Sequence, residues 1–411
     1  MKEKKDVLFL CQYFYPEYVS SATLPLDTAV SLIDAGFTVG ALTGYPKEYN
    51  ITDRVPMKEV YKGIGIKRLK YIQLKRSHFI GRLINYFSFT LSVALRFKEL
   101  RKYKAIIVYS NPPVLPLIAV LANKLFKTKV IFVSYDVYPE MAYITNTISK
   151  DGIISKMMKT INKIIFKRVN KVVALSYEMK TYLLGHRSAL SGNQIEVIPN
   201  WYEDKGVSNL TESTKNKLFS SILKDEKFVV SYFGNMGICQ DLDTIVAAIR
   251  QFKNDSKVQF IFAGHGNKMK VLKEIIEKES LYNVRIFDFL HGQDFQDALN
   301  ISDCFIVSLA DGLTGLAVPS KTYGYMMASK PVIAIIGADS DIAKDLTNNN
   351  AGYSMQVGES LKLVSAILEL KDDKGKREAM GRNCRNVFLE KYTKEHCTKQ
   401  YVDMMRKILE G

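Results

Sequence analysis

Short apolar or β-branched runs alternate with stretches of helical spacing along most of the chain, and this alternation limits its fold more than any other feature. Runs of this kind predict strands buried on both faces, which is typical of a parallel sheet covered by helices on each side. In the first half they are Val7–Cys11, Thr38–Leu42, Ala105–Tyr109 and Val130–Ser134. Helical stretches between them, such as Leu24–Ala35, provide the crossovers that parallel strands need. The first half therefore predicts an α/β fold.

The pattern starts again in the second half of the chain. Its strand-like runs are Phe228–Phe233, Val258–Ala263, Cys304–Leu309 and Pro331–Ile336. The polar stretch Glu203–Lys227 between the halves is rich in Ser, Thr and Lys, as linkers are. We predict two Rossmann-like, doubly wound domains that face a cleft, over residues 1–200 and 201–391. We expect the C-terminal helix, within residues 392–411, to pack back on the first domain.

Positive charge gathers in the first half. Residues 1–200 hold 30 Lys and Arg against 14 Asp and Glu, whereas residues 201–411 hold 28 of each kind. Within residues 67–104, basic and aromatic residues are interleaved, and a later helical stretch carries Lys156, Lys159, Lys163, Lys167 and Arg168. We interpret this surface as one that docks on an anionic membrane, where each cation adds about 1 kcal/mol. Aromatic residues that belong to the core, under a merely solvated charged face, are the alternative.

Cysteine usage and the N-terminus bear on location. The five cysteines are scattered and form no Cys-x-x-Cys pair, which fits buried thiols in a reducing cytosol. Val7–Cys11 has the length of a strand rather than that of a signal peptide. The apolar stretch Leu83–Leu95 is well below the ~20 residues that a membrane helix needs. We expect a cytoplasmic protein, peripheral on the inner face of the plasma membrane.

Glycines follow two of the strands in the second half. Ligands of an open parallel sheet bind at the carboxyl ends of its strands. Gly234 and Gly237 follow one strand and Gly264 and Gly266 the next, where they would let the backbone approach a ligand closely. Gln240 could add an amide donor. Glycine after a strand is also ordinary turn chemistry, so these residues alone decide little.

A third strand end offers a site for an anion. Pro319, Ser320 and Lys321 open a helix, with proline suited to the first turn and serine able to cap. The free N–H groups of that turn, the helix dipole and the Lys321 ammonium would together hold a diphosphate. An ordinary capped helix with an exposed lysine is the alternative.

The order and spacing of these segments resemble the retaining glycosyltransferases of family 4, which have the GT-B fold, and most of all the subgroup similar to bacterial fucosamine transferases. The resemblance covers essentially the whole chain. The segments that carry it are Tyr13-Phe14-Tyr15-Pro16-Glu17, Thr43-Gly44-Tyr45-Pro46, Asp136-Val137-Tyr138-Pro139-Glu140, Ile198-Pro199-Asn200-Trp201, Tyr232-Phe233-Gly234-Asn235-Met236-Gly237, Gln240-Asp241-Leu242-Asp243-Thr244, Phe262-Ala263-Gly264-His265-Gly266, Pro319-Ser320-Lys321, Tyr323-Gly324-Tyr325-Met326 and Lys330-Pro331-Val332-Ile333-Ala334.

The resemblance implies a nucleoside-diphosphate sugar as donor, usually linked to UDP, and a sugar acceptor carried on a polyprenyl diphosphate. It implies that the first domain binds the acceptor and the second the donor. Small residues at Ser20 and Ser21 would let the backbone approach the phosphate. The donor site would further comprise Gly234, Asn235, Gly237, Gln240, Gly264, Gly266, Leu290, His291, Pro319, Ser320 and Lys321.

Four positions depart from the family pattern. Asn235 and Gln240 stand where members generally carry Arg and Lys on the diphosphate. Leu316 and Gly324 stand where two glutamates usually bind the sugar and the ribose. Neither Leu316 nor Gly324 has a side chain that accepts a hydrogen bond, so the usual contacts to sugar and ribose are missing. Lys321 must then stabilise more of the diphosphate charge.

Two carboxylates in the first domain are candidates for catalysis. Asp136 is expected to contact the donor sugar or acceptor hydroxyl and could act as a general base, although a helix cap is an equally good reading of its local position. Glu140 could orient the acceptor. The resemblance implies retention by a front-face displacement in which the departing phosphate helps to deprotonate the acceptor, so that catalysis is positioning plus charge stabilisation. We predict that no metal ion or other cofactor is needed.

Three alternatives belong to other classes. A nucleic-acid-binding protein would use the same basic surface but would not explain the glycine-rich strand ends. An NAD-dependent oxidoreductase would want Gly-x-Gly-x-x-Gly after the first strand, where this chain has no glycine. A sugar-nucleotide epimerase with the GT-B fold remains open. We expect the protein to bind a nucleotide sugar and not nucleic acid.

Overall fold

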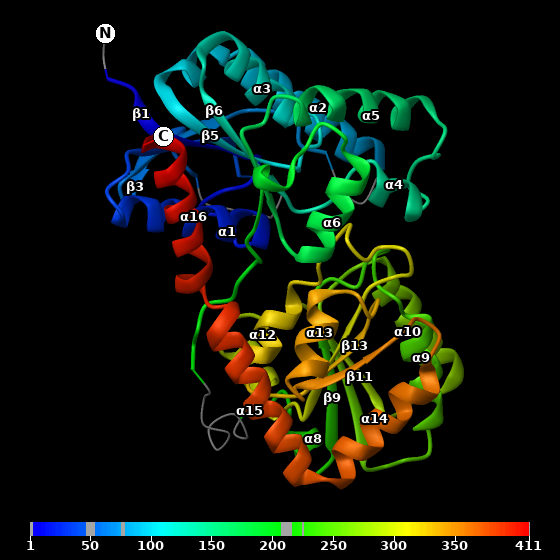
Figure 1. Cartoon of the computed structure of the whole chain (residues 1–411). Coiled ribbons are helices and arrows are strands. Elements are labelled where there is room, and N and C mark those ends of the chain that lie inside the picture. The colour runs from blue at the N-terminus through cyan, green and yellow to red at the C-terminus, as the bar shows by residue number, and fades with distance from the viewer. Residues whose placement is uncertain (1–2, 47–53, 75–78, 207–215, 224–225, 411) are drawn as a thin grey trace. The chain divides into compact units, whose positions relative to one another are not determined.

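The structure is a computed structural model, drawn in Figure 1, that describes residues 3–46, 54–74, 79–206, 216–223 and 226–410. The chain forms two compact units. Unit 1 comprises residues 1–200, 315–318 and 394–411, and unit 2 comprises residues 201–314 and 319–393. The chain thus returns to unit 1 twice after the first exit, once for four residues and once for the C-terminal helix.

Unit 1 is built on an eight-stranded sheet in the order β3-β4-β2-β1-β5-β6-β7-β8. All neighbouring strands are parallel except β3 and β4. The strands are β1 (Lys5–Leu10), β2 (Val39–Gly44), β3 (Lys58–Tyr61), β4 (Ile64–Leu69), β5 (Tyr103–Tyr109), β6 (Lys129–Ser134), β7 (Lys171–Ala174) and β8 (Ile195–Val197). The central strands β1, β2, β5 and β6 are almost wholly buried, as their apolar runs predict.

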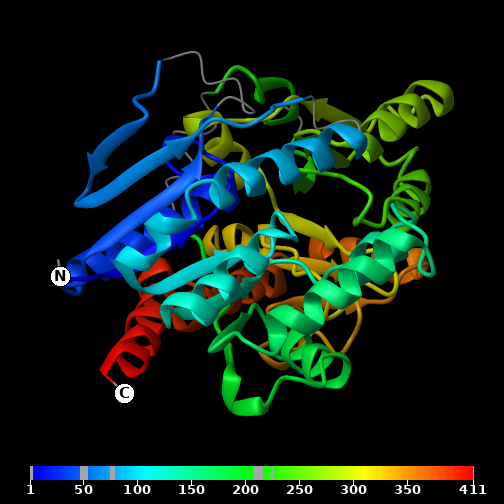
Figure 2. The same ribbon diagram turned by 90° about the horizontal axis from the view of Figure 1, so that it is seen from above.

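Helices cover both faces of this sheet. Figures 1 and 2 place α2, α3 and α5 in one layer on one face, and α1 with α16 on the other. Contacts join α2 to α3, α3 to α5, and α1 to α16. The helices are α1 (Ser20–Asp34), α2 (Phe79–Ala94), η1 (Phe97–Lys102, a 3₁₀ helix), α3 (Leu115–Phe126), α4 (Glu140–Ile144), α5 (Ile153–Phe166), α6 (Tyr177–His186), η2 (Gly192–Gln194, also 3₁₀) and α16 (Lys394–Glu410).

Unit 2 is built on a six-stranded, fully parallel sheet in the order β11-β10-β9-β12-β13-β14. In chain order this is 3-2-1-4-5-6, the order of a Rossmann sheet, and the strand order reverses between β9 and β12. The strands are β9 (Phe228–Phe233), β10 (Val258–Ala263), β11 (Val284–Phe287), β12 (Cys304–Ser308), β13 (Val332–Ile335) and β14 (Gly352–Met355).

The helices of unit 2 complete its core. They are α8 (Ser220–Leu223), α9 (Asp243–Gln251), α10 (Asn267–Glu279), α11 (Gly292–Ile301), α12 (Lys321–Met327), α13 (Asp341–Asn348), α14 (Ser360–Asp372) and α15 (Lys374–Lys391). A continuous apolar cluster joins residues of β9, β10 and β13 to α9 and α14. This rigid base leaves the loops after β9, β10 and β12 at one edge of the sheet, where a ligand of such a fold binds. The α/β class, with two Rossmann-like folds, is as predicted.

Candidate functional site

The loops after β9 and β10 pack backbone against backbone. The N–H of Gly234 donates to the Ala263 carbonyl and that of Met236 to the His265 carbonyl, each at 2.7 Å. A Cβ at Gly264 would lie 2.2 Å from the Gly234 carbonyl oxygen, and one at Gly266 would lie 2.3 Å from that of Met236. Both glycines also have φ above +120°. They are therefore required for the two loops to pair, a structural reason that differs from the approach to a ligand that we expected.

The Gln240 side chain forms a hydrogen bond within the loop after β9 and is not a free amide. Its Oε1 accepts a hydrogen bond of 2.7 Å from the Gly237 N–H. Its backbone carbonyl accepts one from the ammonium of Lys268, the second residue of α10. Asn235 is exposed at the same loop. The sequence analysis did not identify Lys268, although it follows Gly264-His265-Gly266 by two positions. This lysine brings a positive charge to the loop in which Asn235 and Gln240 replace the two cations usual in the family.

Lys321 lies against this loop, because Tyr325 holds α12 to the end of β9. The Tyr325 hydroxyl accepts from the Phe233 N–H at 2.7 Å and donates to the Phe233 carbonyl at 3.0 Å. Lys321 stands one helical turn earlier, on the same face of α12. A Cβ on Gly234 would be 3.0 Å from Lys321 Cε, a contact that the lysine could relieve only by shifting its side chain.

The Lys321 ammonium is enclosed but has no anionic partner among the described residues. Its Nζ lies 5.2 Å from the centre of the Tyr232 ring, within reach of a cation–π contact. Burial lowers the pKa of Lys321 to about 8, and the nearby Cys239 acts weakly in the opposite direction. At neutral pH the side chain is therefore a partly desolvated cation, the state in which an arriving phosphate is bound most strongly.

Pro319 and Ser320 act differently from our expectation. The helix begins at Lys321, so Pro319 precedes it instead of occupying its first turn. Ser320 is the N-cap residue, but its side chain makes no capping hydrogen bond because its backbone is already helical, at φ −61° and ψ −15°. The Pro319 carbonyl instead accepts from the Thr322 hydroxyl at 2.8 Å. The prediction that the Ser320 side chain caps the helix is therefore wrong, and its hydroxyl is left available to a ligand.

An aromatic shelf adjoins the same edge of the sheet, formed by His265, Phe289 and His291. The Phe289 ring, 49% exposed, stands 5.8 Å from that of His265 and 4.7 Å from that of His291, centre to centre. Leu290 lies between Phe289 and His291, and His291 is the N-cap residue of α11. Exposed flat rings of this kind can stack a nucleobase, because every base offers a π face.

The two positions that lack the family's glutamates have different surroundings. Gly324, in α12, is covered by the Tyr202 ring, and a Cβ there would lie 3.3 Å from Tyr202 Cε2. Leu316 belongs to unit 1, where its side chain is fully buried and its carbonyl accepts from the Val137 N–H at 2.9 Å. An aromatic ring therefore occupies one of these places and a packed leucine the other.

Ser20 and Ser21 are the first two residues of α1, directly after the loop that follows β1. Ser20 is exposed and Ser21 half-buried. β1 and β5 are the strands at which the order of the unit 1 sheet reverses, so this helix start lies at the edge expected for ligands. The remaining residues predicted to bind the donor all belong to unit 2.

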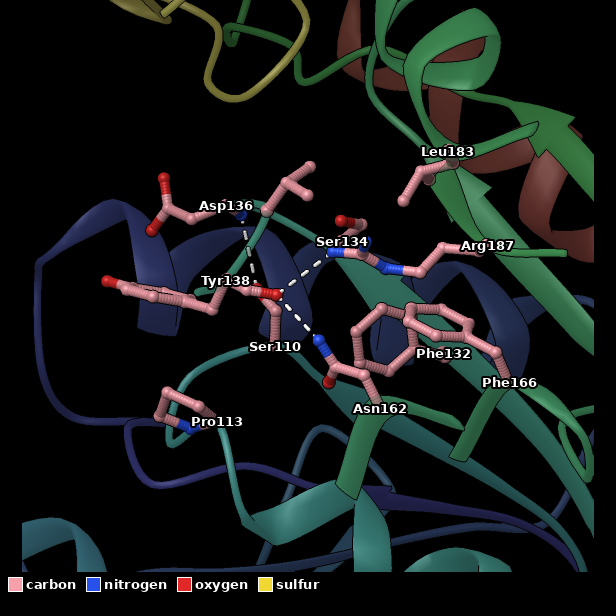
Figure 3. Close-up of a pocket in the computed structure, with 11 residues that line it drawn as sticks. Ser110, Pro113, Phe132, Ser134, Asp136, Tyr138, Asn162, Phe166, Leu183 and Arg187 are labelled. Carbon is pink, nitrogen blue, oxygen red and sulfur yellow. Dashed lines mark hydrogen bonds between the residues drawn. The ribbon is translucent and has the colours of Figure 1, made fainter. Parts of the chain in front are cut away.

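Asp136 follows β6 at the same edge of the unit 1 sheet. Figure 3 shows its carboxyl group pointing away from Arg187 and Asn162, which line the adjoining pocket. Its backbone N–H and that of Tyr135 both donate to the Ser110 hydroxyl, at 3.2 and 3.0 Å. Burial raises the pKa of the Asp136 carboxyl to about 6. Because Asp136 precedes α4 by four residues, it is not that helix's cap.

Glu140 is engaged in a buried ion pair. Both of its oxygens accept from the Arg187 guanidinium, at 2.8 and 2.6 Å. Arg187 also donates to the Tyr138 carbonyl at 3.1 Å, and Asn162 donates to the same oxygen at 2.6 Å (Figure 3). Sequence reasoning found neither Arg187 nor Asn162. Glu140 thus helps to fix the segment that follows Asp136 and is not open to an acceptor.

Aspartates spaced as Asp-x-Asp, which could attract a cation, occur at two helix starts in unit 2. Asp243 and Asp341 are the first residues of α9 and α13, where a carboxylate complements the helix dipole. Asp241 is buried and accepts from the Thr244 N–H. Over the described residues, no three His, Cys, Asp or Glu side chains gather closely enough to hold a metal ion.

The basic and aromatic stretch 67–104 divides between core and surface. Arg68 is 1% exposed and pairs with Glu59, and Phe89 is fully buried. Phe87 and Arg96 are exposed. The stretch is therefore not one surface, and for part of it the alternative interpretation is correct, in which the aromatic residues belong to the core. Within the part of the chain that the structure describes, no helix combines the length and apolar character needed to cross a membrane.

Comparison with known proteins finds similarity to glycosyltransferases. Residues 213–387, which include the loops after β9, β10 and β12, match the family model "Glycosyl transferases group 1". This part of the chain is similar to the group 1 glycosyltransferases. The chain is 23% identical over 325 residues to "Probable glycosyltransferase WbjE" of Pseudomonas aeruginosa, covering 78% of this chain and 79% of that protein. It is 21% identical over 173 residues to WcaI of Escherichia coli, whose name refers to colanic acid biosynthesis, covering 42% of each chain.

Solved structures support the fold of this chain. The HepE protein of Anabaena, in complex with UDP, superposes with a TM-score of 0.74 at 15% identity, covering 98% of this chain and 100% of that one. The fold is GT-B, as predicted.

Proposed function

We propose that this protein transfers a sugar from a UDP-sugar to a saccharide carried on a polyprenyl diphosphate, with retention, in the synthesis of bacterial surface polysaccharide. The observation that carries the donor half of the proposal is the Lys321 ammonium, enclosed beside Gly234 without an anionic partner among the described residues. A partly buried cation of this kind is costly unless an anion pairs with it. A nucleotide diphosphate at the strand ends would do so.

The donor would lie along the edge of the unit 2 sheet. Its diphosphate would be bound by Lys321 and the Ser320 hydroxyl, beside the loop Gly234–Gly237, whose Gly234, Met236 and Gly237 N–H groups already donate within the protein. Lys268, already at the Gln240 carbonyl, would add a second charge in place of the cations that the family usually has. The base would stack on the aromatic shelf beside Leu290. UDP in the HepE complex supports a uridine base for this chain.

For the transfer, we propose that the acceptor hydroxyl oxygen forms a bond to the anomeric carbon on the face that the diphosphate leaves. The bond between that carbon and the phosphate oxygen breaks, and UDP carries away the electron pair. The hydroxyl proton passes to the departing phosphate or to Asp136. Charge stabilisation at Lys321 would then supply most of the catalysis, without a metal ion or other cofactor.

Asp136 is our candidate for the group that contacts the acceptor hydroxyl or donor sugar. Its raised pKa makes it a stronger base than an ordinary aspartate and still leaves it ionised at neutral pH. Glu140 would act indirectly, because its ion pair with Arg187 holds in place the segment that begins at Asp136. Ser20 and Ser21, at the start of α1, would approach the donor from unit 1. We accordingly propose that residues 1–200 with the C-terminal helix bind the acceptor.

We propose the acceptor, the location of the protein and its subgroup from observations other than those on Lys321. The name of WcaI refers to colanic acid biosynthesis, which supports a role in polysaccharide synthesis. The net positive charge of residues 1–200 supports a peripheral place on the inner face of the plasma membrane. The segments Gly234–Gly237 and Gln240–Asp243 favour the fucosamine-transferase-like subgroup, and therefore a hexose or N-acetylhexosamine as the transferred sugar.

A two-step assay tests the proposal. Nucleotide sugars with different bases are first screened for thermal stabilisation, since a ligand at 100 times its Kd adds about 2.7 kcal/mol. The hit is then incubated with a saccharide on a short polyprenyl diphosphate, and the anomeric configuration of the product is read by proton NMR. Stabilisation by UDP-sugars alone and a retained configuration are expected. Stabilisation only by another nucleotide, or an inverted product, would overturn the corresponding part.

A further inference from the structure

Three neighbouring helices of unit 1, α2, α3 and α5, contain no aspartate or glutamate. Their only charged residues are the cations Arg82, Lys124, Lys156, Lys159 and Lys163. Asp and Glu make up 42 of the 411 residues of the chain, so composition alone would place some in these helices. A helical surface that lacks carboxylates altogether favours an anionic partner.

The same helices expose large apolar side chains. On α2, Ile80, Phe87 and Leu91 are exposed, and Leu95 follows the end of the helix. Their spacing of seven, four and four residues places them on one face. Leu91 is 60% and Leu95 78% exposed. Single exposed leucines are common on soluble proteins, but a stripe along one face of a helix marks an interaction surface.

A second stripe lies on α5. Ile153, Met157 and Ile164 are exposed at helical spacing, with Ile153 at 86%. Lys156, Lys163 and Lys167 are exposed on the flank of this stripe, and Ile165 and Phe166 pack inward. Such an arrangement, with an aliphatic stripe bordered by lysines, is typical of helices that lie in the plane of a membrane surface.

Helix α3 joins the two stripes. It contacts both α2 and α5, and it exposes Leu121 and Leu125 together with Lys124 and Lys127. Figure 2 shows the three helices in one layer on the near side of the unit 1 sheet. The exposed apolar residues therefore belong to one layer of neighbouring helices, which we call the α2–α3–α5 layer.

We propose that the α2–α3–α5 layer binds an anionic phospholipid bilayer by inserting its aliphatic side chains between the lipids while its lysines bind the headgroups. The inference deepens the proposed function, on which it rests for the presence of a membrane, by naming the surface and the mode of binding. The charge and the apolar residues of this layer distinguish an anionic bilayer from a second copy of the chain and from nucleic acid as its partner. A second copy of the same layer would bring cations against cations with no carboxylate to offset them. Nucleic acid would match the lysines but would leave Leu91 and Ile153 unused.

Insertion predicts a salt dependence different from that of charge alone. A surface held only by lysines loses its binding once salt screens the headgroups. Buried aliphatic side chains add a contribution that salt does not remove. Binding to anionic vesicles should therefore fall at 0.5 M NaCl yet remain measurable.

The test uses the full chain with vesicles of phosphatidylcholine and phosphatidylglycerol, read by cosedimentation without donor or acceptor. The double variant Leu91→Glu with Ile153→Glu should bind at least tenfold more weakly than the unchanged protein. The matched control is Leu361→Glu, which changes an exposed leucine on α14 of unit 2 and should bind as the unchanged protein does. Equal vesicle binding by the double variant would overturn the proposal.

Two further readouts separate this proposal from others. Thermal stabilisation by UDP should be the same in the double variant and the unchanged protein, so loss of vesicle binding with UDP binding intact isolates the lipid surface. If the protein did not bind UDP but still bound vesicles, the proposed function would be contradicted, whereas the lipid-binding surface would be supported. Sedimentation velocity should show a monomer. A dimer that Leu91→Glu dissociates, or RNA binding that the same change abolishes, would contradict the bilayer as the occupant.

Discussion

The Lys321 ammonium lies 5.2 Å from the centre of the Tyr232 ring. Its alkyl chain crosses over Gly234, where a Cβ would stand 3.0 Å from Cε. Neither neighbour carries a negative charge, so burial costs this lysine energy that a bound diphosphate would return.

Replacing Lys321 by Met should stabilise the protein in the absence of ligand. Burial lowers the pKa of Lys321 to about 8 from 10.5, so the folded state disfavours the charged form. The cost is fully present below pH 8 and disappears as the pH rises toward 10.5, where the unfolded chain also loses the proton. We expect a gain on the order of 2 kcal/mol at pH 7, smaller at pH 10, by urea denaturation at both pH values. A loss of stability at pH 7 would contradict this description of the lysine.

Lys268→Met should weaken UDP binding by roughly tenfold to a hundredfold, since a hydrogen bond to a charged group contributes about 1.5–3 kcal/mol. The Lys268 ammonium is held at the Gln240 carbonyl, close to the loop proposed to bind the diphosphate. Lys270→Met changes an exposed lysine two residues along the same helix and serves as the control. Calorimetric titration with UDP compares the two variants. Equal affinities would remove Lys268 from the donor site.

Gly264→Ala should destabilise the fold by roughly 2 kcal/mol or more, because the new Cβ would lie 2.2 Å from the Gly234 carbonyl oxygen and φ is +133°. Gly185→Ala in α6 is the control, since nothing lies within 4 Å of a Cβ there. Its effect should stay within about 1 kcal/mol. The midpoints of urea unfolding decide, and an unchanged midpoint for Gly264→Ala would show that the two loops do not need to pair.

Asp136→Asn should lower kcat by about 10²- to 10⁴-fold, as loss of a general base does, with a smaller effect on donor affinity. The unchanged enzyme should lose activity as the pH falls through about 6, because its carboxylate is then protonated. The raised pKa also means that ionised Asp136 costs the fold energy above pH 6, a cost absent below pH 3.8.

The variant should therefore melt at a higher temperature than the unchanged protein at pH 7.5 and equally at pH 4. Asp151→Asn, at an exposed aspartate before α5, is the control for both readouts. Full activity of Asp136→Asn would leave Asp136 with a structural role only.

Much of the fold could be predicted from the sequence, because apolar runs such as Phe228–Phe233 and Val258–Ala263 bury both faces of a strand and admit few architectures. The glycines after these strands were also found, but not their reason. Sequence marks a position that needs glycine, whereas only the structure names the Gly234 and Met236 carbonyls that a side chain would strike.

Contacts distant in sequence account for the rest. Glu140 reads as a free carboxylate until Arg187, 47 residues later, takes both of its oxygens. Arg68 reads as a surface cation until Glu59 and the sheet enclose it. Ser320 has the residue type of a helix cap, but its own backbone is helical. Partners and backbone angles of this kind follow from the packed chain, not from the local pattern.

The most direct measurement is calorimetric titration of UDP and of uridine into the unchanged protein and Lys321→Met. UDP should bind the unchanged protein and bind the variant at least tenfold more weakly, whereas uridine, which has no diphosphate, should bind both equally weakly. UDP affinity that survives the loss of Lys321 would contradict the assignment of the diphosphate to this site.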